Sequence, residues 1–220
     1  MSVNHSEISS FIWNVCDDVL RGLFKPHEYG DIILPFTVLR RLDCVLEEHK
    51  DTVINLHNEF KSKVEDPTPI ILNKVNTSFF NHSQFDLNRL KQDPSNIQMN
   101  LQNYLGGFSN NVLEVVENFQ LEKPIEKLNK NNRLYQFIEK FSEIDLHPDV
   151  VSNHQMGQVF EELLRKFSEM SNETSGEHYT PRDVVRLLVS LVFSKDKDEL
   201  QGEGKVRSIF DPCCGTGGML

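Results

Sequence analysis

The sequence predicts a mainly helical N-terminal domain followed by the beginning of an α/β domain with a parallel sheet. Over roughly the first 150 residues, apolar side chains recur at helical spacing, and no strongly β-branched alternating segment interrupts them. Near the end of the chain the pattern becomes helix, charged turn, short apolar strand and glycine-rich loop. That order is typical of the start of an α/β domain.

The helical part divides at breaker residues into a series of predicted helices. Their apolar positions lie three and four residues apart, and their ends coincide with Pro, Gly or capping side chains. Asp31 is the expected cap of the second helix, with Pro35 in its first turn, and Gly106-Gly107 closes the fourth. The predicted helices cover residues 8–23, 32–48, 52–64, 93–105, 110–119 and 125–141.

The segment 144–149 resembles a hinge, which places a helical domain at 1–149 and a second domain at 150–220. Ser152 and Gln155 have the spacing of a capping box and mark the start of a long amphipathic helix.

After a polar loop, the chain predicts one more helix and one strand. The helix covers 181–193 and the strand covers 206–210, directly before the glycine-rich loop. We expect that strand to be buried in a sheet.

Composition and charge narrow the class of function. With 38% hydrophobic and 25% charged residues, the chain is an ordinary globular protein. It contains no apolar run near the roughly 18 residues of a membrane helix and no secretory signal, so we expect a cytoplasmic protein without a membrane span. The net charge of −10 repels nucleic acid overall, so a basic face must be local or come from a partner. We interpret Arg40-Arg41 as a solvated helix edge rather than a phosphate contact.

The four cysteines do not form a metal-binding pattern. No CxxC or Cys/His spacing suits zinc, and we predict reduced thiols and no metal site. Cys213 and Cys214 are interpreted as small residues that fill a loop, and not as nucleophiles or metal ligands.

The loop from Asp211 to Gly218 has the composition of a ligand-binding turn. Glycines after a buried strand let the backbone approach a ligand, and ligands of open α/β sheets lie at this end of a strand. The loop is neither a P-loop nor a G-x-G-x-x-G motif. An acid beside bare glycine amides suits a small zwitterion, such as the methionyl part of S-adenosylmethionine. The alternative is a tight turn that binds no ligand.

A second segment, Gly176 to Val185, combines helix punctuation with residues that punctuation does not explain. Thr180, Pro181 and Asp183 suit the start of a helix. The start of a helix does not explain the preceding run, Gly176-Glu177-His178-Tyr179. A helix N-terminus can bind a carboxylate, and this segment is expected to face the glycine loop if the helix packs beside the strand.

Together these motifs resemble the adenine-specific DNA methyltransferase domain of type I modification subunits (HsdM). The resemblance is carried by GEHYTPRDVVRLLV followed by FDPCCGTGGML, and upstream by FIWNVCDDVLRGLFKPHEYGDIILPFTVLRRLDCVLEE, YLGGFSNNV and EIDLHPDVVSNHQMGQVFEELLRKF. It implies a Rossmann-like fold for the second domain and S-adenosylmethionine as cofactor. It also implies methyl transfer to N6 of adenine in double-stranded DNA.

The resemblance also implies which residues contact the cofactor. One group corresponds to the motif that precedes the glycine loop, and the other to the glycine loop itself. The two groups are Glu177, His178, Tyr179, Thr180, Pro181 and Arg182, and Asp211, Gly215, Thr216, Gly217 and Gly218.

The same family uses an Asn/Asp-Pro-Pro-aromatic motif for catalysis, and this chain contains no Pro-Pro pair. We therefore assign no catalytic residue and expect these 220 residues alone to be inactive. The family's specificity and restriction subunits are the implied partners, in a hetero-oligomer. The alternatives are a non-catalytic module for assembly or DNA clamping, and the opening of a fused restriction–methylation or phage-defence enzyme.

Overall fold

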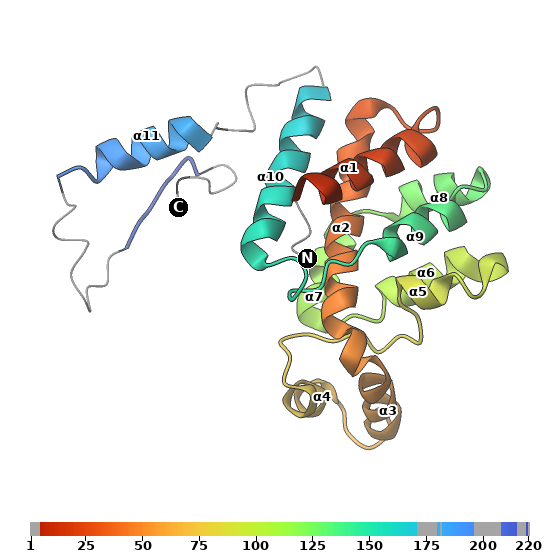
Figure 1. Cartoon of the computed structure of the whole chain (residues 1–220). Coiled ribbons are helices and arrows are strands. Elements are labelled where there is room, and N and C mark those ends of the chain that lie inside the picture. Colours follow the sequence, from red (N-terminus) through yellow and green to blue (C-terminus); the bar gives the residue numbers. More distant parts are fainter. Residues whose placement is uncertain (1–4, 171–179, 181, 196–207, 215–218, 220) are drawn as a thin grey trace. The chain divides into compact units, whose positions relative to one another are not determined.

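The computed structural model describes residues 5–170, 180, 182–195, 208–214 and 219 (Figure 1). By compactness the chain divides into two units, Met1–Leu163 and Leu164–Leu220. The regular structure of the described residues is helical, as predicted for the first part of the chain. The α-helices are α1 His5–Val15, α2 Tyr29–Leu46, α3 Lys50–Phe60, α4 Thr68–Val75, α5 Leu87–Leu90, α6 Ile97–Leu105, α7 Asn110–Asn118, α8 Glu122–Lys130, α9 Leu134–Glu143, α10 Asn153–Met170 and α11 Arg182–Val192.

Several predicted helices are present with shifted ends. The first continues from α1 into a π-helical turn, Cys16–Leu20, and the chain then turns at Gly22 with a φ of 78°. Helix α2 begins at Tyr29, before the predicted cap Asp31, so Pro35 lies inside the helix rather than in its first turn. The helix loses the bond that the Pro35 N–H would have made, and the burial of this face, including Pro35 and Phe36, accounts for its persistence.

The helix predicted over 125–141 is wrong, because the chain forms two helices there. Asn132 adopts a left-handed conformation with a φ of 55° between α8 and α9. The Arg133 N–H then donates to the Leu128 carbonyl at 2.9 Å. Asn tolerates this conformation at the end of a helix, and apolar spacing that happens to continue across it conceals the break.

The core of the helical unit forms where α2 meets α9. Phe36 packs edge-on against Phe137 with ring centroids 4.8 Å apart, and Phe137 and Phe141 lie 4.9 Å apart. In Figure 1, α2 runs through the helical unit, and α3 and α4 lie side by side beyond one end of it. That end has a small core of its own around Val53 and Ile71.

The predicted strand does not appear in the described residues. Val206 and Arg207 lie outside that part of the chain, and Ser208, Ile209 and Phe210 form no ladder with any described residue. Phe210 is 86% exposed, so the expectation of a buried strand is wrong for these three residues. A strand is held by hydrogen bonds to its neighbours, and none of the described segments supplies them.

Candidate functional site

Most residues of the predicted cofactor pocket lie outside the described part of the chain. Thr180, Arg182 and Asp211 are the predicted site residues that the structure describes. The others are Glu177, His178, Tyr179, Pro181, Gly215, Thr216, Gly217 and Gly218. The pocket itself therefore stays a prediction.

The described members belong to the two predicted motifs. Thr180 is exposed and precedes α11, which begins at Arg182 and carries Asp183 in its first turn. The helix predicted over 181–193 is thus confirmed over Arg182–Val192. Its start places backbone N–H groups, which lack partners within a helix, next to the motif that contains Thr180.

Asp211 organises the start of the glycine loop. Its Oδ1 accepts a hydrogen bond from the Cys213 backbone N–H at 2.9 Å, which closes a local turn over Pro212. A carboxylate has several lone-pair sites, so this bond leaves capacity for a ligand. Cys213 and Cys214 are both exposed, unlike residues that fill a packed loop.

Helix α11 presents an apolar face. Five of its large apolar side chains are exposed, at spacings of three and four residues that place them on one side of the helix. They are Val184, Leu187, Leu188, Leu191 and Val192. Such a face is typical of a helix that packs on a sheet or a partner.

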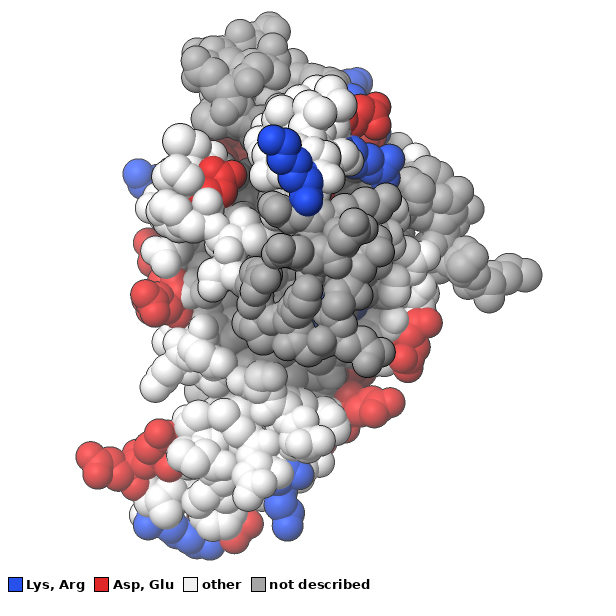
Figure 2. Space-filling model, turned by 90° about the vertical axis from the view of Figure 1, so that its left-hand side faces the viewer, with Lys and Arg blue, Asp and Glu red and all other residues white. Residues whose placement is uncertain are grey.

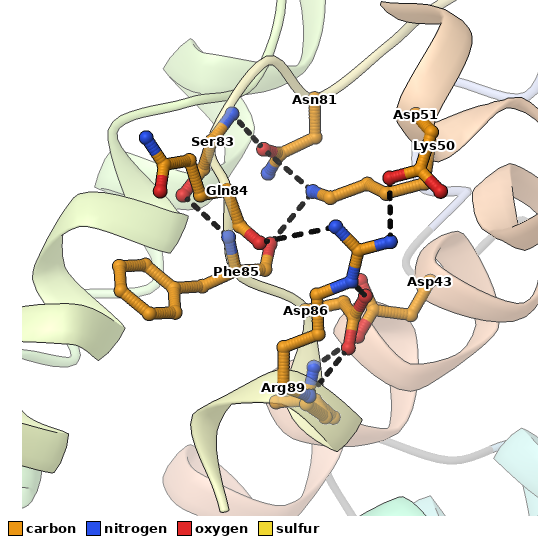
Figure 3. Close-up of polar contacts among 10 residues, drawn as sticks. Asp43, Lys50, Asp51, Asn81, Ser83, Gln84, Phe85, Asp86 and Arg89 are labelled. Carbon is orange, nitrogen blue, oxygen red and sulfur yellow. Dashed lines mark hydrogen bonds and ion pairs between the residues drawn. The ribbon is translucent and has the colours of Figure 1, made fainter. Parts of the chain in front are cut away.

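The helical unit contains a buried polar network that sequence reasoning missed (Figure 3). Lys50, from the first turn of α3, donates to the Phe85 carbonyl at 2.6 Å, and its Nζ lies 3.4 Å from Asn81 Oδ1. Asp43, from α2, accepts the Leu87 backbone N–H at 2.8 Å. The network therefore joins the segment between α4 and α5 to two helices far from it in sequence.

Burial shifts the ionisation of both charged members. It raises the pKa of Asp43 to about 6, although the Leu87 hydrogen bond opposes the shift. It lowers the pKa of Lys50 to about 8, although Asp43 opposes it. A cavity of about 20 Å³ lies beside them, with room for about one water molecule. Because Asp43 bonds to the Leu87 backbone and Lys50 to the Phe85 carbonyl, the network is a structural joint rather than a reaction centre.

Gly107 is part of the same joint. A Cβ at this position would lie 2.7 Å from Asn81 Oδ1 and 2.8 Å from the Ser83 backbone nitrogen. Its carbonyl accepts the His82 N–H at 2.8 Å. The sequence predicted this glycine as a helix stop. Nothing in the residues next to Gly107 indicates its contact with the segment near Asn81.

The segment expected to be a hinge is held by two arginines. Arg40 Nε donates to the Ile144 carbonyl at 2.6 Å. Arg41 donates to the carbonyls of Leu146 and Val151, and also to Asn153 Oδ1 at 2.7 Å. The interpretation of this pair as a solvated helix edge is wrong. Both guanidinium groups are occupied by backbone carbonyls about a hundred positions further along the chain, a contact invisible in local sequence.

An open groove of about 760 Å³ lies among α6, α7 and α8. Leu105, Leu113, Val116 and Leu121 supply its apolar lining, and Gln, Glu and Lys side chains complete it.

Across the described residues, no group of three or more His, Cys, Asp or Glu side chains could hold a metal ion. None of the described helices is long and apolar enough to cross a membrane.

Charge at the α3–α4 end of the helical unit is mixed rather than separated by sign on the face that Figure 2 shows. In the lower lobe of Figure 2, which is the α3–α4 end, basic and acidic side chains alternate on the visible face. Lys63 there pairs with Glu59 at 3.1 Å. On this face, the α3–α4 end therefore offers no strong local attraction for the DNA backbone.

Comparison with known proteins identifies two family segments. Residues 8–141 match the HsdM N-terminal domain, and residues 151–220 match the N-6 DNA methylase family. The chain is homologous to type I restriction enzyme methylase subunits.

It is 25% identical over 226 residues to the MjaIX subunit of Methanocaldococcus jannaschii, covering 97% of this chain and 38% of that protein. It is 40% identical over 87 residues to the EcoEI subunit of Escherichia coli, covering 40% of this chain and 15% of that protein. The chain thus spans less than two fifths of the length of these curated relatives.

Proposed function

The chain belongs to the HsdM N-terminal domain family, and from this premise we propose that residues 150–220 open an S-adenosylmethionine-dependent, N6-adenine DNA methyltransferase domain of Rossmann-like fold. The observation that carries the proposal is the order of the two matched segments, which is the order of a type I methylase subunit. Residues 1–149 are then its helical domain.

The proposed cofactor site joins the two motifs. The group Glu177, His178, Tyr179, Thr180, Pro181 and Arg182 contacts the methionine end of the cofactor, together with Asp211, Gly215, Thr216, Gly217 and Gly218. The turn closed by Asp211 supports this assignment, because it presents backbone next to an acid at the start of the glycine loop. The apolar face of α11 supports it too, because a helix of such a domain packs against the sheet.

The intact protein is proposed to work as one subunit of a cytoplasmic hetero-oligomer on double-stranded DNA. The two relatives are methylase subunits of type I restriction enzymes. We propose that a specificity subunit selects the sequence and that a restriction subunit completes the assembly. The net charge of −10 agrees with sequence readout by a partner.

The test is methyl transfer by the intact protein that contains this chain, assembled with its specificity subunit. We expect labelled methyl groups to pass from S-adenosylmethionine to adenine in DNA. Asp211→Asn removes a charged acceptor, so cofactor affinity should fall about ten- to a hundredfold.

A matched control neutralises a different acid. Glu114 is exposed on α7, and Glu114→Gln should leave cofactor affinity unchanged. If Asp211→Asn binds the cofactor like the parent protein, Asp211 has no place in the site. Methyl transfer by residues 1–220 alone would contradict the expectation that catalysis needs the Pro-Pro motif absent here.

A further inference from the structure

The four cysteines of the chain fall into two classes. Cys16 and Cys44 are each 1% exposed within the helical unit. Burial raises the pKa of Cys16 to about 12 and also raises that of Cys44, whose Sγ accepts the Leu146 N–H at 3.4 Å. Because the thiolate is the reactive form, these two cysteines are protected from thiol reagents.

Cys213 and Cys214 are adjacent and exposed. They follow the turn that Asp211 closes on the Cys213 backbone N–H, so the backbone entering the pair has a defined shape. Two thiols on neighbouring residues can reach one small atom together. No other described part of the chain offers two exposed thiols.

We propose that Cys213 and Cys214 form a dithiol site for trivalent organoarsenicals. Sulfur ligands select soft, thiophilic centres, and arsenic(III) that carries one organic group has two positions left for thiolates. In the reaction with an arsine oxide, two As–S bonds form while the As–O linkage and both S–H bonds break. The oxygen leaves with both thiol protons as one water molecule, and neither arsenic nor sulfur changes oxidation state.

The donor set selects against the common structural metal. A tetrahedral zinc site needs four ligands, and the described residues contain no cluster of three or more His, Cys, Asp or Glu that could contribute. An arsenic(III) atom that carries one organic group has two remaining ligand positions, and two thiols fill both. The site thus differs from the cofactor pocket in its ligand chemistry, even though both use the same loop.

Phenylarsine oxide tests the site on residues 1–220 as they stand. We expect a single adduct per chain by intact mass, stable to a wash with a monothiol and removed by a dithiol. Trypsin cleaves after Arg207, and the adduct should lie on peptide 208–220, which contains both cysteines.

Cys213→Ser and Cys214→Ser should each abolish the adduct that survives the monothiol wash, because one sulfur alone is displaced. Both positions are exposed, so neither change disturbs the core. The matched control, Cys16→Ala with Cys44→Ala, should keep the adduct, and peptide mapping of the parent chain gives the location independently if that control misfolds. An adduct on Cys16 or Cys44, its survival in either Ser variant, or no adduct at all overturns the proposal. The reaction needs no cofactor, so its outcome is separate from that of the methyltransferase assignment.

Discussion

At the scale of single residues, Gly107 shows how closely two segments of the helical unit approach. Because a Cβ there would meet Asn81 and Ser83 within 2.8 Å, Gly107→Ala forces backbone or side chains apart. We expect it to lower the free energy of unfolding by about 1–3 kcal/mol, measured by urea denaturation.

Gly157 provides the matched control. It lies on an exposed face of α10, and a Cβ there would meet nothing within 4 Å. Gly157→Ala should therefore stabilise the helix by about 0.5–1 kcal/mol. Equal effects of the two substitutions would show that the close approach at Gly107 is relaxed in solution.

Asp43 is the residue whose burial should give the stability of the chain a pH dependence. Its pKa is raised from 3.8 unfolded to about 6 folded, so the folded state binds more protons between those values. Stability from this group is then highest below pH 4 and falls as pH rises to about 6. Lys50, with a pKa of about 8, stays charged throughout this window.

Asp43→Asn keeps an acceptor for the Leu87 N–H and removes the titration. The stability of the parent chain relative to this variant should fall by about 2–3 kcal/mol between pH 4 and 6 and then level off. Chemical denaturation of both proteins at several pH values measures this difference. A difference that is flat, or that rises with pH, contradicts the burial of an ionisable Asp43.

At the scale of elements, Arg41 joins α2 to the segment before α10. Its planar guanidinium reaches two carbonyls and the Asn153 side chain at once, which the single ammonium of lysine cannot reproduce. Arg41→Lys and Arg41→Ala should both speed hydrogen exchange across residues 144–151, and Arg41→Ala should lower the free energy of unfolding by about 1–3 kcal/mol.

An exposed arginine serves as the comparison. Arg21 pairs with Asp17 at 2.6 Å with a side chain that is 71% exposed. Arg21→Ala should change stability by less than about 0.5 kcal/mol and leave exchange at 144–151 unaltered. Unchanged protection of that segment in Arg41→Ala would show that Arg41 does not hold it.

At the scale of the whole molecule, we expect the apolar face of α11 to pack against further structure in the intact protein. Leu187 and Leu191 are 59% and 61% exposed here. Leu187→Gln with Leu191→Gln should leave the unfolding of the helical unit within about 0.5 kcal/mol of the parent chain. In the intact protein, the same pair should destabilise the methyltransferase domain by about 2 kcal/mol or more.

Leu163→Ala gives the contrasting behaviour. Leu163 is fully buried in α10, so its truncation should cost about 2–5 kcal/mol in residues 1–220 as well as in the intact protein. Thermal unfolding of both lengths distinguishes the two patterns. If the α11 variants leave the intact protein unchanged, the face stays solvated there.

Local physical signals made the helical class and the start of α10 predictable. The capping box is present, with the Ser152 N–H donating to Gln155 Oε1 at 2.9 Å and the Gln155 N–H to Ser152 Oγ at 3.3 Å. Such contacts span a few residues, and short sequence windows contain them. The break at Asn132 was missed, because the apolar spacing continues across it and one residue in a left-handed conformation leaves almost no pattern.

By itself, then, the sequence determined the helical class of the first domain, the start of α10 and the membership in the HsdM N-terminal domain family. Each follows from short-range periodicity, capping or motif order. Only the tertiary structure decided that Arg40 and Arg41 hold the segment after α9, that Gly107 lies against Asn81, and that Asp43 and Lys50 are buried. The reason is that these contacts join residues brought together by the packing of helices. The sequence around either residue does not indicate which residue it contacts.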